Sequence, residues 1–180
     1  MKCYFIKASR FKGNLLGILS VFLLFTAFIY AQNDSSTNSG NMLPPDAVKP
    51  TDPWIASDII TIPDLVSQLN NKKRNNPIII QIGFKSLYED AHIPGSMFAG
   101  PAESDDGIQL LKLKTKKMNR NSNIVLYCGC CMWYECPNIR GAYKEMKALD
   151  FTNVKALYIP SSFNADWIDK GYPVKKEDTN

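Results

Sequence analysis

Two short apolar runs, IIIQI at residues 78–82 and NIVLY at residues 123–127, constrain what this chain can fold into more than any other feature. Runs of this kind, β-branched and almost continuously apolar, are typical of strands that are covered on both faces. A third run, NVKALYI, occupies residues 153–159. Segments with apolar residues at helical spacing separate the three runs. The sequence therefore predicts an α/β fold with a central parallel sheet and helices on both faces.

The predicted helices carry start signals as well as periodicity. Thr61 precedes Pro63 and an apolar face, which is the pattern of a capped amphipathic helix. GIQLLKLKTKKM, residues 107–118, places apolar side chains on one side and lysines largely on the other. NADWIDKG, residues 164–171, is expected to form a last short helix. After Pro137, helical spacing joins a further set of apolar residues, Ile139, Ala142, Tyr143, Met146 and Leu149.

Residues 1–31 have the layout of a secretory signal peptide. Four basic residues precede an apolar block from Leu15 to Ile29, and Ala31 is a candidate cleavage position. The block has about fifteen residues, fewer than the roughly twenty that span a bilayer, and an uncleaved membrane anchor is the alternative. We therefore expect an exported protein, periplasmic or secreted, without membrane contact once the signal has been removed.

Export also changes the charge balance. The full chain has a formal net charge of +4, and residues 1–31 carry four positive and no negative charges, so the remainder is close to neutral. A near-neutral domain gives no indication of nucleic-acid binding. Residues 32–53 are rich in Ser, Asn, Asp and Pro, as a flexible linker is. Residues 54–180 are enough for one domain with its own core.

Four of the five cysteines lie in YCGCCMWYECPN, residues 127–138, directly after the second predicted strand. Ligands gather beyond the carboxyl ends of parallel strands, and Cys128 lies at such an end. The loop leads into a helix N-terminus, whose free N–H groups and dipole favour a thiolate. We therefore expect Cys128 to be the reactive thiol, held ionised by these dipoles. Cys136, next to the helix start, is the second candidate.

Other interpretations of the four thiols stay open. Buried cysteines behave as small apolar core residues. Thiolates also bind metals, although adjacent Cys130 and Cys131 do not easily share one tetrahedral ion, which favours a soft ion such as Cu(I) over zinc. Cys128 and Cys131 have the spacing of a dithiol redox site. In an oxidising compartment such thiols form disulfides.

Four stretches resemble, in the right order, motifs of the rhodanese-like domain (sulfurtransferase) family. IIIQIGFKSLYEDAHIPGS resembles its strand, helix and HIPG turn, IVLYC its catalytic strand and cysteine, LDFTNV its GFxNV motif, and DWIDKGYPV its closing WxxxGxPV motif. The resemblance covers about residues 55–175. It implies a single α/β domain, and a cysteine that accepts sulfane sulfur from a donor such as thiosulfate or polysulfide and passes it to an acceptor.

Carried over by position, Cys128 is the sulfur-carrying nucleophile, and Cys131 or Cys136 is the candidate that resolves the intermediate as a disulfide. The loop is about five residues longer than is usual in the family, and the usual arginine at its end is absent. Arg140, one turn into the helix, is the candidate substitute for contacting an anion. The expected substrate-binding residues are Gly129, Cys130, Trp133, Asn138 and Arg140.

We therefore predict an exported sulfurtransferase that needs no cofactor and acts on a small sulfur-containing anion or a thiol acceptor. Trp133 and Tyr134 have no obvious core to join, and they are expected to wall the thiol pocket or to dock a protein partner at the loop. His92 belongs to the HIPG turn, where a structural role is expected. The alternatives are a non-catalytic thiol module that binds a soft metal or a partner, and a dithiol/disulfide redox protein.

Overall fold

The computed structural model describes residues 43–45, 47–71 and 76–177. The chain divides into two units, residues 1–39 and 40–180, and only the second contains described residues. The predicted signal peptide, residues 1–31, and the first part of the predicted linker thus lie outside the described residues. Among the described residues, no helix combines the length and the apolar character that crossing a bilayer requires.

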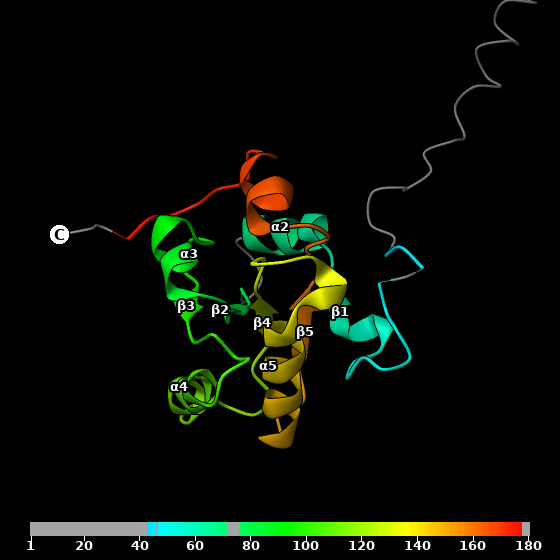
Figure 1. Cartoon of the computed structure of the whole chain (residues 1–180), viewed down its shortest axis with the longest axis vertical. Coiled ribbons are helices and arrows are strands. Elements are labelled where there is room, and N and C mark those ends of the chain that lie inside the picture. The colour runs from blue at the N-terminus through cyan, green and yellow to red at the C-terminus, as the bar shows by residue number, and fades with distance from the viewer. Residues whose placement is uncertain (1–42, 46, 72–75, 178–180) are drawn as a thin grey trace, which may run out of the picture. The chain divides into compact units, whose positions relative to one another are not determined.

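The second unit is built on one sheet of five strands in the order β1-β5-β4-β2-β3, and every neighbouring pair is parallel (Figure 1). The predicted α/β fold is confirmed. The three strands expected from the sequence form the centre of the sheet, while the two edge strands have two residues each and give no periodic signal. The strands are β1 (Ile59–Ile60), β2 (Ile78–Gln81), β3 (Met97–Phe98), β4 (Ile124–Tyr127) and β5 (Val154–Leu157).

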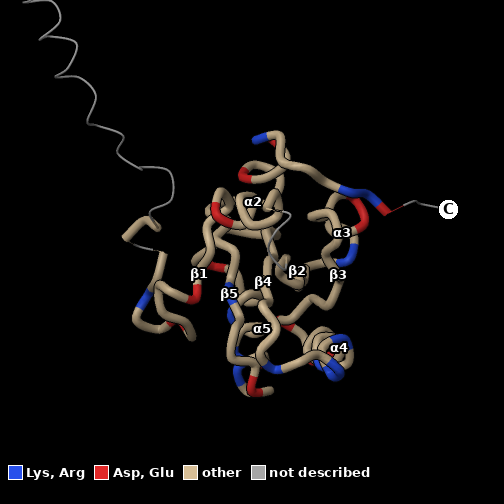
Figure 2. Tube along the Cα trace, turned by 180° about the vertical axis from the view of Figure 1, so that it is seen from behind, with Lys and Arg blue, Asp and Glu red and all other residues tan. Residues whose placement is uncertain are grey.

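The helices begin where the sequence provides caps. Thr61 accepts a hydrogen bond from the backbone N–H of Asp64 at 3.2 Å, and Ser104 does the same for Gly107 at 3.1 Å. The α-helices are α2 (Ile62–Asn70), α3 (Lys85–Asp90), α4 (Asp105–Thr115) and α5 (Pro137–Ala148), with shorter turns η1 (Ala56–Asp58), η2 (Trp133–Glu135) and η3 (Asn164–Ile168). The lysines expected on the outer side of α4 are visible as the basic positions along this helix in Figure 2.

Residues of β4 alternate between two hydrophobic clusters, as the pleat of a strand dictates. Ile124 and Leu126 pack in the cluster that contains buried residues of α4 and α5. Val125 and Tyr127 pack in the other cluster, with residues of α2 and η3. Cys128 follows the alternation and belongs to the cluster that contains α5 residues. The pleat therefore directs this thiol toward the helix that follows the cysteine loop.

The packed domain begins earlier than Trp54, so the predicted flexible linker does not extend to residue 53. Ala47 is buried, and its carbonyl oxygen accepts a hydrogen bond of 2.7 Å from the indole nitrogen of Trp133. Leu43 and Val48 pack against the same core. Residues 32–53 are polar on average, and the average composition does not reveal the few apolar side chains that pack against the core.

His92 lies in a structural turn, as expected. Its Nδ1 atom is 2.7 Å from the carbonyl oxygen of Tyr88, and the two rings stack at 3.9 Å. Its backbone forms an antiparallel bridge with Lys175. These contacts tie the turn after α3 to the last described segment of the chain. The histidine is not among the residues that line the pocket beside Cys128.

Candidate thiol site

The cysteine loop leaves β4 through Gly129, at a position that has no room for a side chain. Gly129 has a φ of +74°, and a Cβ atom added to it would lie 2.6 Å from the Cβ atom of Phe163. The carbonyl oxygen of Gly129 also accepts a hydrogen bond of 2.9 Å from the Phe163 N–H. The start of the loop is therefore pinned against the segment that follows β5.

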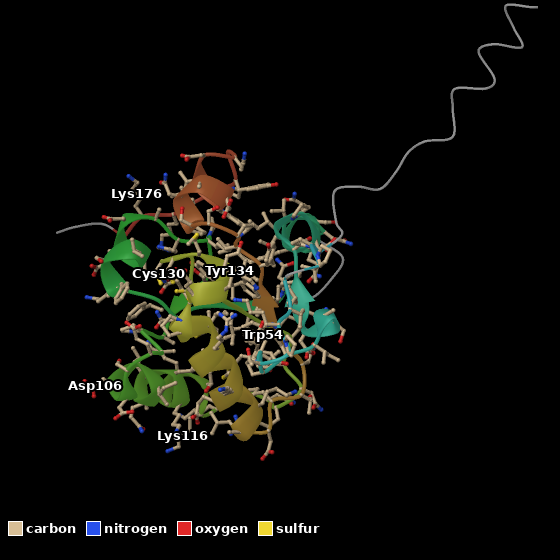
Figure 3. The ribbon with its side chains drawn as sticks, turned by 45° about the vertical axis from the view of Figure 1, so that its right-hand side comes forward. Trp54, Asp106, Lys116, Cys130, Tyr134 and Lys176 are labelled. Atoms are coloured by element: carbon tan, nitrogen blue, oxygen red, sulfur yellow. The ribbon has the colours of Figure 1, made fainter. Side chains whose placement is uncertain are left out.

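The loop brings its sulfur atoms together. The Sγ atoms of Cys128 and Cys130 are 3.0 Å apart, and those of Cys130 and Cys131 are 3.4 Å apart. The Sγ atoms of Cys128, Cys130 and Cys136 all lie within 4.8 Å of one another. All four residues are free thiols in the structure. Figure 3 shows where Cys130 lies, between α3 and the start of α5.

Hydrogen bonds within the cluster place the negative charge on Cys130. Those from Cys128 and Cys136 lower the pKa of the Cys130 thiol far below its usual range, and Asn138 contributes a further N–H at 3.6 Å. The pKa of Cys128 is raised, first by its hydrogen bonds to Cys130 and Cys136 and then by burial. The sequence predicts that the helix dipole ionises Cys128; in the structure, hydrogen bonds to the neighbouring thiols raise the pKa of Cys128 instead.

The helix start acts on Cys136 instead. This residue is the N-cap of α5, and the N–H of Ile139 lowers its pKa. Its hydrogen bond with Cys128 is the largest single cause and also lowers the pKa, but the bond with Cys130 and burial outweigh both, so the pKa is raised overall. The pKa of Cys131 is also raised, mainly by burial and then by its hydrogen bond to Cys130. Cys130 is thus the one thiol of the four whose pKa is lowered.

A pocket of about 260 Å³ lies beside two of the sulfurs. Cys128 is only 5% exposed, yet it lines this pocket together with the half-buried Cys130. The thiol that we expected to be reactive is therefore reached through the pocket and not from the open surface. The other lining residues are Gln81, Leu87, Asp90, Ala91, Tyr127, Gly129, Ser162, Phe163, Asn164 and Ile168.

Gly83 has no side chain, and this leaves space for the sulfur of Cys128. A Cβ atom at this position would lie 2.9 Å from the Cys128 sulfur and 3.0 Å from Nε2 of Gln81. The amide of Gln81 and the thiol therefore approach the same small space from two sides. Gln81 pairs in register with Tyr127 across the sheet, which explains how the end of β2 comes to lie beside the end of β4.

Trp133 differs from its expected position. It is buried, its ring lies 5.1 Å from that of Trp54 and 5.1 Å from that of Tyr158, and it is absent from the pocket beside Cys128. We predicted that this ring would find little core. The described residues before Trp54 supply that core, because Ala47 covers the indole edge. Tyr134 is more than one-third exposed, with the Lys49 ammonium 5.0 Å from its ring centre.

Asn138 and Arg140 support the loop from behind and do not line the pocket. Asn138 is buried, donates to Cys130 and accepts a hydrogen bond of 2.9 Å from the Glu103 N–H. The Arg140 guanidinium contacts Asp52 at 2.7 Å and donates to the carbonyl oxygens of Trp133 and Cys136. The expected anion contact of Arg140 is therefore not seen, since the Asp52 carboxylate and two loop carbonyls engage its donors.

Sequence reasoning missed the residues that line the rest of the pocket. Gln81 is polar within an otherwise apolar strand, which was a usable signal. Asp90 at the end of α3 and the segment 162–164 gave no such signal. They reach the pocket only because the sheet order places the ends of β2, β4 and β5 at one edge.

Comparisons with known proteins agree with this architecture. A family model described as Rhodanese-like domain matches residues 63–158. BH2092 from Bacillus halodurans is 20% identical, with a TM-score of 0.51 and coverage of 67% of this chain and 77% of that one. Alr3790 from Anabaena sp. is 19% identical, with a TM-score of 0.50 and coverage of 65% and 91%. A thiosulfate sulfurtransferase from Pseudomonas aeruginosa is 20% identical at a TM-score of 0.49, with coverage of 68% and 20%. No curated protein sequence matches this chain.

Proposed function

Because this chain belongs to the rhodanese-like domain family, whose model matches more than half of its residues, we propose that it transfers sulfane sulfur through a persulfide on Cys128. One observation carries the proposal: Cys128 lines a pocket at the carboxyl end of β4, and its sulfur lies 3.0 Å from the sulfur of Cys130, whose pKa is lowered. A thiolate is the nucleophile in sulfur chemistry, and here the pair shares one charge.

The reaction has two displacement steps. The Cys128 thiol, oriented by its hydrogen bond to Cys130, gives its proton to solvent, and the Cys128 thiolate attacks the outer sulfur of the donor. The donor S–S bond breaks, its electron pair leaves with the rest of the donor, and the outer sulfur stays on Cys128. An acceptor thiolate then attacks that terminal sulfur, and the Cys128 thiolate leaves. In a second possible outcome, the thiolate of Cys131 or Cys136 attacks the inner sulfur of the persulfide, Cys128 Sγ. The S–S bond of the persulfide then breaks, hydrosulfide leaves, and a disulfide with Cys128 forms.

The test is mass spectrometry of the reduced protein after incubation with a sulfane-sulfur donor. We expect the mass of one added sulfur atom on the peptide that contains Cys128. The matched variants are Cys128→Ser and Cys136→Ser, since Cys136 is a buried thiol that does not line the pocket. Loading that persists in Cys128→Ser, or that is lost only in Cys136→Ser, contradicts the assignment.

A soft-metal site is the second candidate function. Three sulfurs within 4.8 Å of one another, two of them buried, form a ligand set that suits Cu(I), which prefers thiolates. Binding would replace the S–H protons and would occupy Cys128, so metal binding and sulfur transfer exclude each other. Anaerobic titration with Cu(I) tests this site. Stoichiometric binding that Cys136→Ser abolishes and Cys131→Ser retains supports it, and equal binding by both variants opposes it.

We also propose that the protein is exported. Its support is the basic and apolar pattern of residues 1–31, which is typical of a signal that directs a protein to a periplasmic or extracellular compartment. Expression of the full chain in a bacterial host, followed by fractionation and N-terminal sequencing, tests it. A mature N-terminus after Ala31 in the periplasm or medium is expected. A protein that keeps Met1 in the cytosol contradicts export.

A further inference from the structure

The pocket beside Cys128 contains negative charge and no compensating positive charge. None of the described residues that line it is Lys or Arg. Its charged groups are the Asp90 carboxylate and the Cys130 thiolate. Charge of a single sign in a confined site repels a ligand of the same sign. A dianionic donor such as thiosulfate therefore fits this pocket poorly.

The lining of the same pocket includes two residues whose side chains can accept hydrogen bonds, Gln81 and Asp90. Gln81 is 2% exposed and lines the pocket, and its Oε1 atom has no hydrogen-bond partner among the described residues. Asp90 is exposed and forms no ion pair within the described part of the chain. Because Oε1 of Gln81 has almost no accessible surface and Asp90 is exposed, the Asp90 carboxylate is the acceptor that a ligand in the pocket can reach.

We propose that the sulfur donor is a small organic sulfane-sulfur compound that carries an ammonium group, which pairs with the Asp90 carboxylate. Phe163 and other apolar lining residues would contact its carbon chain. The volume of about 260 Å³ lies below the usual range of about 300–1,000 Å³ for ligand sites, which limits the chain to a few carbons. This assignment rests on the proposed sulfur transfer and narrows its substrate class.

The contribution of the ammonium group can be measured by comparing two thiosulfonate donors. Ethanethiosulfonate and 2-aminoethanethiosulfonate have the same reacting group and differ by one ammonium. In either case the Cys128 thiolate attacks the outer sulfur, the S–S bond breaks, and the sulfinate leaves with the electron pair. The products are the Cys128 persulfide and the sulfinate, so atoms and charge balance. Thiosulfate serves as the dianionic comparison.

The measurement is kcat/KM for sulfur transfer to a common thiol acceptor with each donor. We expect the aminated donor to exceed ethanethiosulfonate by about threefold to fivefold, the effect of one partly exposed charge pair, and thiosulfate to be the poorest. Asp90→Asn should remove the preference for the ammonium group. Glu89→Gln, one residue away but outside the lining of the pocket, is the matched control and should retain it.

Binding of the two sulfinate products, which needs no turnover, separates this inference from the proposed function. Tighter binding of 2-aminoethanesulfinate than of ethanesulfinate, lost in Asp90→Asn, supports the pocket assignment even where no donor is turned over. Equal binding of the two sulfinates, or equal kcat/KM for the two thiosulfonates, overturns it while leaving sulfur transfer intact. A preference for thiosulfate over both also overturns it.

Discussion

The two halves of the cysteine loop have different surroundings. Cys128, Trp133 and Cys136 all belong to the buried core cluster on the α5 face of the sheet, but of the three only Cys128 lines the pocket of about 260 Å³, together with Cys130. The first half thus presents sulfur to a ligand, and the second half anchors the loop. The extra residues that lengthen this loop beyond its expected size therefore form a packed support and not a loose insertion.

The anchor depends on a segment far away in the sequence. The carbonyl of Ala47 holds the indole of Trp133, and Asp52 holds Arg140, which in turn donates to two loop carbonyls. The Arg140 guanidinium also lies 5.2 Å from the ring centre of Trp54. These contacts hold the loop in place through residues that are distant from it in the sequence. We expect changes in the anchor to affect stability first, and changes in the reactive half to affect chemistry first.

The largest expected effect is the loss of sulfur transfer in Cys128→Ser. Removal of a nucleophile lowers the rate of covalent catalysis by more than about a thousandfold, because the sulfur that forms the persulfide is absent. The rate of sulfur transfer to a thiol acceptor measures this loss. Unfolding by urea should show little change in stability. A variant that keeps even one-tenth of the rate would mean that another sulfur carries the reaction.

Trp133→Ala should destabilise the fold by about 3–5 kcal/mol, since it removes a large buried ring and leaves a cavity. Tyr134→Ala, next along the chain but more than one-third exposed, is the matched control and should change stability by less than about 1 kcal/mol. Urea unfolding of both variants gives the two values. Similar costs for the two would show that the second half of the loop is not packed as described.

Asp52→Asn should have a smaller effect of about 2–3 kcal/mol, because it leaves the Arg140 guanidinium without its carboxylate. The Asp52 side chain is 1% exposed and that of Arg140 is 21% exposed, so part of the lost interaction is replaced by water. Glu89→Gln, which disrupts an exposed pair with Lys85, should cost less than about 1 kcal/mol. Unfolding free energies that are equal for the two variants would contradict the anchoring role of Asp52.

Much of the fold follows from the sequence because its signals are local. The alternation of apolar strands and amphipathic helices predicted the central strands β2, β4 and β5 and the parallel sheet, and Thr61 predicted the start of α2. The position of Cys128 at the end of β4 followed from the same pattern. The edge strands β1 and β3, with two residues each, carry too few positions for a period to be visible.

The interior of the site could not be predicted, because it depends on contacts between distant segments. The burial of Trp133 follows from residues near Ala47, and the ion pair of Arg140 follows from Asp52. The charge on Cys130 depends on distances between sulfur atoms, which a sequence does not contain. A helix start can be predicted from a sequence, whereas the hydrogen bonds among the thiols that raise the pKa of Cys128 cannot.

The most direct test of this account is the pH dependence of alkylation at each cysteine, mapped by mass spectrometry. Hydrogen bonds lower the pKa of Cys130, so its thiolate persists as the pH falls below the usual range, while the raised pKa of Cys128 keeps it protonated until the pH rises above that range. At pH 5 an ordinary thiol is ionised to less than about one part in a thousand. We predict selective alkylation of Cys130 by iodoacetamide at this pH. Selective alkylation of Cys128 instead, or no alkylation of any of the four, would contradict the account.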